Sequence, residues 1–201
     1  MANEAPPTGE PGFNLQADQG DRIRASNIAF IIIPTVFVVL RLVSRKISRA
    51  GYWWDDLLIV LALLLSYVLP ILNLISIPRG FGRHIWILPL DATSMFLQTL
   101  WVFELFFGLT ICFNKLSILA FYRRIFPIAQ LRIVLLIMTA VVLCFTVTFV
   151  MIVIFQCVPI HAFWDVEDRV HARCVNVNLL FLVAGGVNCA LDALIVFMVQ
   201  P

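Results

Sequence analysis

The chain has 201 residues, of which 62% are hydrophobic and only 13% are charged. Soluble globular proteins are nearer half apolar and a quarter charged, and here the apolar residues fall in long blocks, so the composition excludes an ordinary soluble domain. The formal net charge of +2 is too small to indicate a nucleic-acid partner, and no stretch interleaves basic with aromatic residues as single-strand-binding proteins do.

Residues 1–22 are predicted to form a disordered tail. They are polar and rich in proline and glycine, so nothing in them could bury a core. A cleavable signal peptide has a basic start followed by an apolar run, whereas residues 1–21 contain acidic residues and no lysine or arginine. We therefore expect the first apolar block to act as its own membrane-insertion signal.

Five long apolar blocks follow, and each predicts a transmembrane helix. Blocks of about 18 or more apolar residues with few charges are typical of membrane spans, and each block is long enough to cross about 30 Å of hydrocarbon at 1.5 Å per residue. The expected fold is therefore all-α, a polytopic transmembrane helix bundle over residues 23–201. Its spans are expected at about 23–43, 54–77, 95–122, 131–155 and 175–199.

The distribution of lysine and arginine predicts how the helices are oriented. Short loops that are rich in these residues stay in the cytosol. The loops after the first and third spans are short and densely basic, whereas the basic residues on the other side are spread more thinly. We therefore expect a multi-pass protein with an extracellular N-terminus and two cytosolic basic loops; these loops and their flanks contain Arg41, Arg45, Lys46, Arg49, Arg123, Arg124 and Arg132.

Polar residues within the spans are the first candidates for a binding site. Glu104 and Lys115 lie eleven residues apart in the third span, which is close to three helical turns, so they share one face about 16 Å apart. Asn188 and Asp192 lie one turn apart in the fifth span. Lys115 and Asp192 are at similar depths from the cytosolic side, and we predict that Lys115 pairs with Asp192 or Asn188.

Two interpretations of this polar group remain open. Charges inside a membrane usually face the interior of the bundle, where they mark ligand or switch sites. A buried ion pair can also do no more than fix the register of two helices. A proton or ion path through these residues is less favoured, because transporters usually show broken helices in repeated halves and no repeat is visible here.

The fourth loop is bracketed by Cys157 and Cys174. On the predicted orientation this loop is extracellular, and an oxidising compartment favours a disulfide between the two. His161 and His171 lie in the same loop, so the four residues also form a set of zinc-ligand types, although the spacing is not that of a standard zinc finger. Free thiols are the third alternative. We expect no metal and no cofactor.

Two charged pairs lie at the expected cytosolic ends of the helices. Asp55 and Asp56 begin the second span, where acidic residues offset the helix dipole and cap free amides, and they could also contact Arg41 or Arg45. Arg123 and Arg124 close the third span. They are either a basic flank that sets the orientation or a contact for a cytosolic partner.

No enzyme signature is visible in the sequence. The chain contains no GxSxG nucleophile motif, no HExxH zinc motif and no glycine-rich phosphate loop. We therefore expect a protein without catalytic activity. The adjacent Gly185 and Gly186 in the fifth span are typical of close helix packing rather than of chemistry.

Several short motifs, in their order and spacing, resemble the fungal rhodopsin-domain family of integral membrane proteins. This family includes receptor-like proteins of filamentous fungi, such as the plant-pathogenicity receptor type. The resemblance covers nearly all of the chain after residue 20. It rests on residues 53–56 (WWDD), 80–84 (GFGRH), 115–119 (KLSIL), 121–127 (FYRRIFP), 155–157 (FQC), Pro159, Trp164, Asp165, Cys174, Asn188, Asp192 and Pro201.

The resemblance implies a seven-helix, G-protein-coupled-receptor-like fold in the plasma membrane with an extracellular N-terminus. It also implies a disulfide between Cys157 and Cys174, and it makes Glu104, Lys115 and Asp192 positions of the family pattern. A lipid bilayer, a heterotrimeric G protein and an unidentified small-molecule ligand are the implied partners. Only five spans are visible, so we expect either a fragment of a longer protein or a five-helix remnant. A transporter or a membrane accessory protein without signalling activity is the alternative.

Overall fold

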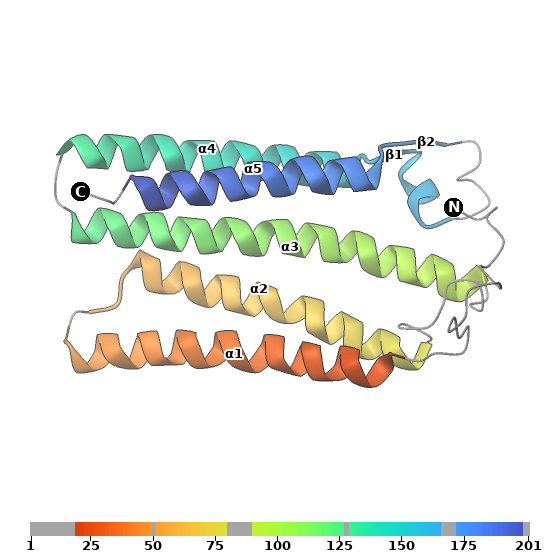
Figure 1. The fold of residues 1–201 in the computed structure, drawn as a ribbon, viewed down its shortest axis with the longest axis horizontal. Coiled ribbons are helices and arrows are strands. Elements are labelled where there is room, and N and C mark those ends of the chain that lie inside the picture. Colours follow the sequence, from red (N-terminus) through yellow and green to blue (C-terminus); the bar gives the residue numbers. More distant parts are fainter. Residues whose placement is uncertain (1–18, 50, 80–89, 127–128, 166–171, 199–201) are drawn as a thin grey trace, which may run out of the picture.

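The computed structural model describes residues 19–49, 51–79, 90–126, 129–165 and 172–198, and five long helices dominate it (Figure 1). Each of the five is long and apolar enough to cross a membrane. The prediction of an all-α transmembrane bundle is therefore confirmed. The helices are α1 (Gly20–Ile47), α2 (Trp54–Ser76), α3 (Leu90–Ile125), α4 (Ala129–Ile154) and α5 (Val177–Phe197).

The helix ends differ from the predicted spans by a few residues: α5 is two residues shorter at each end, whereas α1 and α3 continue past their apolar blocks into charged residues. α1 ends at Ile47 rather than at 43, and Arg45 and Lys46 form its last turn. Arginine and lysine are good helix formers, and their long side chains carry the charge from the helix surface to water. Of the predicted tail, residues 20–22 belong to the first turn of α1, and residues 1–18 lie outside the described part of the chain.

Side-chain caps fix the starts of α2 and α5. The Asp56 carboxylate accepts a hydrogen bond from the backbone N–H of Trp53 at 3.3 Å. The Asn176 side-chain oxygen accepts from the backbone N–H groups of Asn178 and Leu179 at 3.1 and 3.3 Å. Such bonds satisfy amides that have no partner within the helix, so each helix begins at a defined residue.

The helices lie side by side along the long axis of the molecule, with α2 between α1 and α3, and with α3 packed against both α2 and α4 (Figure 1). A short 3₁₀ turn, η1 (Ile77–Arg79), extends α2. The α1–α2 and α3–α4 connections lie at one end of the bundle (Figure 1). At the other end, β1 (Cys157–Val158) pairs antiparallel with β2 (Arg173–Cys174), and η3 (Ile160–Phe163) follows β1.

The outer surface of the bundle is apolar, as expected for contact with lipid. Phe30, Leu136 and Leu182 are 69%, 63% and 74% exposed, respectively, and many other large apolar side chains are similarly open. Contiguous apolar surface of this extent is rare on soluble monomers. The chain is therefore a multi-pass membrane protein in contact with the bilayer. Its interior holds a small apolar cluster formed by Cys112, Leu119, Leu135, Val142 and Ile195.

Candidate functional site

The predicted contact between α3 and α5 is present. The Lys115 side chain is almost fully buried, and its ammonium forms an ion pair with the carboxylate of Asp192. The same ammonium donates a hydrogen bond to the backbone carbonyl of Asn188 at 3.2 Å. The two partners differ in burial, because the Asp192 side chain remains 56% exposed. Lys115 therefore contacts both of its predicted partners.

A cavity of about 150 Å³ lies beside this ion pair, between α3, α4 and α5. Lys115 and Asn188 both line it, and most of the remaining lining is apolar. The Asn188 side-chain oxygen is buried, and it has no hydrogen-bond partner in the described part of the chain. The cavity thus combines a mainly apolar wall with the Lys115 ammonium and the unpaired side-chain oxygen of Asn188. An apolar lining with a few polar groups is common to small-molecule sites.

One close approach between α3 and α4 shapes the wall of this cavity. Gly108 on α3 faces the Phe149 ring on α4, and a Cβ at Gly108 would lie 2.7 Å from two carbons of that ring. A contact this short is not tolerated by carbon atoms, so only glycine allows Phe149 to occupy its present place. Both residues line the cavity.

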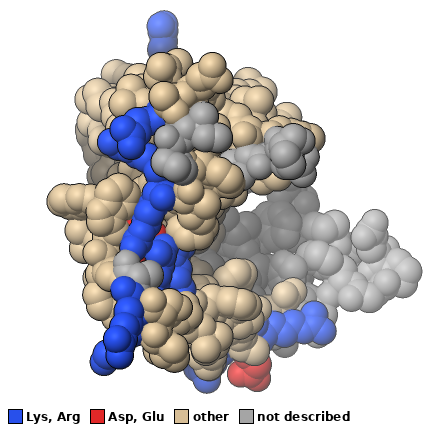
Figure 2. All heavy atoms as spheres, turned by 90° about the vertical axis from the view of Figure 1, so that its left-hand side faces the viewer, with Lys and Arg blue, Asp and Glu red and all other residues tan. Residues whose placement is uncertain are grey.

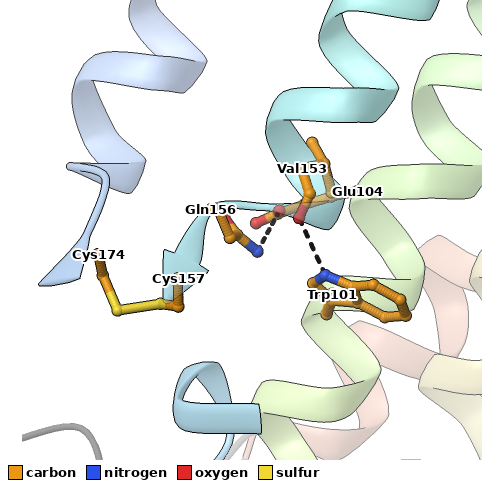
Figure 3. Close-up of a disulfide and its surroundings, with 6 residues drawn as sticks. All are labelled: Trp101, Glu104, Val153, Gln156, Cys157 and Cys174. Atoms are coloured by element: carbon orange, nitrogen blue, oxygen red, sulfur yellow. Dashed lines mark hydrogen bonds between the residues drawn. A yellow bond between two sulfur atoms is a disulfide. The ribbon is translucent and has the colours of Figure 1, made fainter. Parts of the chain in front are cut away.

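Glu104, the fourth residue predicted for the polar site, lies in a separate cluster nearer the N-terminal end of α3. Its side chain is fully buried, and its carboxylate accepts a hydrogen bond from the Gln156 side-chain amide at 3.2 Å (Figure 3). It is not among the residues that line the cavity. The structure therefore brings together Lys115, Asn188 and Asp192, and it separates Glu104 from them.

The Glu104 cluster adjoins the loop between α4 and α5. Cys157, directly after Gln156, forms a disulfide with Cys174, as the sequence predicted (Figure 3). This bond uses both sulfur atoms, which rules out the zinc alternative that needed them as thiolates; His171 lies outside the described residues. Next to the loop, the Trp101 indole N–H donates to the Val153 carbonyl at 3.0 Å and so joins α3 to the end of α4.

The opposite end of the bundle contains a buried ionic cluster formed by α1, α2 and α3. Asp55 is fully buried, and its carboxylate contacts Arg41 at 3.0 Å and Arg45 at 2.6 Å. The neighbouring Asp56 carboxylate lies 3.5 Å from the same two arginines. The expected contact of the acidic pair with Arg41 and Arg45 is therefore present. Figure 2 shows the basic side chains as a band across this end of the molecule, with only a small acidic area visible within the band.

α3 contributes three residues to this ionic cluster, which the sequence patterns did not predict. Arg124 lies 3.6 Å from the Asp55 carboxylate, and the Ser117 hydroxyl donates to the Asp55 backbone carbonyl at 2.8 Å. The Phe121 ring lies 5.3 Å from the guanidinium carbons of both Arg41 and Arg45. The three residues follow the i, i+4, i+7 spacing of one helix face, which is the signal that could have predicted the contact.

The predicted partner-contact residues thus differ in their surroundings. Arg124 points inward, toward Asp55 and the Gly51 carbonyl, which it contacts at 3.2 Å. Arg123 is exposed at the end of α3. Arg124 therefore contributes to the ionic cluster, whereas Arg123 is available at the surface. In the described part of the chain, no group of three or more histidine, cysteine or acidic side chains is placed to hold a metal ion.

A comparison with known families identifies the chain. The model of the fungal rhodopsin domain matches residues 40–201. The chain belongs to the fungal rhodopsin domain family. The match includes the residues of the ionic cluster, the cavity and the disulfide-linked loop, so all three features lie in the fungal rhodopsin domain. Neither the search of curated proteins nor the search of solved structures found a match.

Proposed function

We propose that this fungal rhodopsin domain protein is a receptor-like protein of the plasma membrane, with its N-terminus outside, that senses an extracellular small molecule and couples to a heterotrimeric G protein. The observation that carries the proposal is the cavity beside Lys115. It lies among three helices, it has buried polar groups of both hydrogen-bonding kinds, and it has an ion pair at its border. The proposal assigns the protein no catalytic step.

α3 offers a direct physical link between the cavity and the cytosolic end. Lys115 borders the cavity, and Ser117, two residues later, is bonded to the buried Asp55. A ligand that changes the position of Lys115 therefore acts on the same stretch of α3 that holds the ionic cluster. Arg123, exposed beyond that cluster, is the residue we assign to contact with the G protein.

The test is the substitution Lys115→Ala in the full-length protein. We expect loss of G-protein association, measured by energy transfer between a luciferase fused to the receptor and a fluorescent Gα subunit. Surface expression, measured by antibody access to an N-terminal epitope tag on intact cells, is expected to stay close to the wild-type level. The matched control is Gln98→Ala, at an exposed position of α3 outside the cavity.

Two outcomes contradict this proposal. If surface expression collapses with Lys115→Ala but not with Gln98→Ala, the ion pair is a structural element of the bundle. If coupling persists at the wild-type level, Lys115 has no part in signalling. The epitope measurement also tests the orientation, because a tag that is reached only after permeabilisation places the N-terminus inside.

A second candidate function is transport without signalling, and the exposed carboxylate of Asp192 is the observation that favours it. Ionisable side chains within membrane spans are found along substrate and proton pathways, and Asp192 is half exposed on α5 beside the cavity. The discriminating measurement is the flux of a small solute into vesicles that contain the purified protein. Flux that disappears with Asp192→Asn supports a transporter.

A further inference from the structure

The cavity wall is built mainly from aromatic rings. Phe107 on α3, Phe145 and Phe149 on α4, and Phe181 on α5 all line it. Aromatic rings favour stacked or edge-to-face contact with another ring over contact with a flexible chain of the same area. A volume of about 150 Å³ is also the size of cavity that accommodates a single benzene ring. The wall therefore fits one small aromatic molecule.

The polar groups at the cavity specify what such a molecule must carry. The Lys115 ammonium has three N–H donors, and two of them are used in the described structure, by Asp192 and by the Asn188 carbonyl. One donor therefore remains. The buried side-chain oxygen of Asn188 has no partner there and needs a donor. A hydroxyl group satisfies both, because it accepts from one neighbour and donates to another.

The charges around the cavity disfavour ionised ligands. Lys115 is already neutralised by Asp192, so the pair has no net charge to offer. A ligand carboxylate would lie near the Asn188 oxygen and would compete with Asp192, whereas a ligand ammonium would lie near the Lys115 ammonium. A buried charge that lacks a partner is strongly disfavoured. An uncharged ligand meets neither conflict.

From these observations we infer that the cavity binds a small, uncharged aromatic alcohol, with its ring among the phenylalanines and its hydroxyl between Lys115 and the Asn188 side chain. The inference rests on the proposed function, because it names the ligand class of the same site. Binding to the purified protein needs no G protein, however, so the two can fail separately.

The experiment uses 4-fluorobenzyl alcohol and the full chain in lipid nanodiscs, with fluorine NMR as the readout. Empty nanodiscs give the contribution of partition into lipid. We expect a saturable broadening of the fluorine signal that excess benzyl alcohol reverses. The probes 4-fluorotoluene, 4-fluorobenzoate and 4-fluorobenzylamine are expected to bind more weakly, because the first lacks the hydroxyl and the other two carry a charge.

Two substitutions on α5 locate the site. Ala184 lines the cavity, and Ala184→Phe is expected to abolish saturable binding by filling it. The matched control is Ala190→Phe, at an exposed position outside the cavity lining. Asn188→Leu removes the acceptor but keeps the backbone carbonyl that Lys115 uses, and the loss of one hydrogen bond predicts binding about tenfold weaker. This variant serves as the test if Ala184→Phe does not fold.

Each contrary result overturns the inference in a distinct way. Equal binding of 4-fluorotoluene means a purely apolar site, and tighter binding of 4-fluorobenzoate means an anion site. A signal that is not saturable, or that persists equally in both phenylalanine variants, means partition into lipid alone. Absence of binding together with loss of coupling in Lys115→Ala would reject the ligand class and leave the receptor proposal standing.

Discussion

At the scale of single residues, the most consequential side chain is Asp55. It is fully buried, and three arginines from two other helices surround its carboxylate. Each arginine is partly exposed, so water shares in its solvation, whereas the carboxylate depends entirely on these partners and on the start of its own helix. The cluster therefore joins α1, α2 and α3 through one carboxylate.

The first prediction concerns this carboxylate. Asp55→Asn keeps the shape of the side chain but removes the closer counter-charge of Arg41 and Arg45, which then have only the Asp56 carboxylate at 3.5 Å. Removal of one partner from a buried ion pair typically costs on the order of 3 kcal/mol of stability. We expect a clearly lower midpoint of thermal unfolding in detergent, followed by circular dichroism. Asp21→Asn, at an exposed site in the first turn of α1, is the control and should leave the midpoint nearly unchanged. Equal midpoints for the two variants would mean that the cluster adds no stability.

At the scale of elements, α3 is the central helix, and three polar groups follow one another along it. Glu104 is bonded to Gln156 near the disulfide-linked loop, Lys115 reaches α5 beside the cavity, and Ser117 begins the face that contacts the ionic cluster. Polar contacts between helices matter in a membrane because hydrocarbon gives no hydrophobic force to hold one helix against another. α3 thus connects both ends of the bundle to the cavity between them.

The second prediction tests the packing of α3 against α4. Gly108→Ala places a methyl group 2.7 Å from the present position of the Phe149 ring, so the ring or the helix must move. Overpacking of this kind typically costs about 1–3 kcal/mol. Gly185→Ala is the matched control, since nothing lies within 4 Å of its added Cβ, and alanine favours a helix over glycine by up to about 1 kcal/mol.

Thermal unfolding distinguishes the two glycine variants. We expect a lower midpoint for Gly108→Ala and an unchanged or higher midpoint for Gly185→Ala. Binding of 4-fluorobenzyl alcohol should also weaken in Gly108→Ala, because Phe149 lines the cavity. If both variants unfold at the same temperature, the contact between Gly108 and Phe149 does not determine how closely α3 and α4 pack.

Features of the fold that depend on hydropathy, or on position along a single helix, could be predicted from the sequence. The five helices follow from apolar blocks, and the contact between Lys115 and Asp192 follows from their similar depth in two spans. The bond between Gln156 and Glu104 was not predicted, because Gln156 lies just beyond α4, where helix periodicity no longer places a side chain. The cavity was not predicted either, because it depends on the distances between helices, and these are set by tertiary contacts such as Gly108 with Phe149.

At the scale of the whole molecule, the two ends of the bundle differ in charge and in covalent structure. One end carries the basic band (Figure 2), and the other carries β1 and β2 (Figure 1), which a disulfide joins (Figure 3). Dense basic residues favour the cytosol, and disulfides persist in oxidising compartments. Both features therefore support the same orientation, with the basic end inside the cell.

The last prediction tests this orientation without any substitution. The lysines of the chain are Lys46, which is exposed in the last turn of α1 at the basic end, and Lys115, which is buried. A membrane-impermeant amine reagent applied to intact cells should leave both unmodified, as read by mass spectrometry of chymotryptic peptides. After permeabilisation it should modify Lys46 but not Lys115, because Lys115 lies inside the bundle and in an ion pair. Modification of Lys46 on intact cells would place the basic end outside and reverse the orientation, whereas modification of Lys115 would show that the cavity side of α3 is open to water.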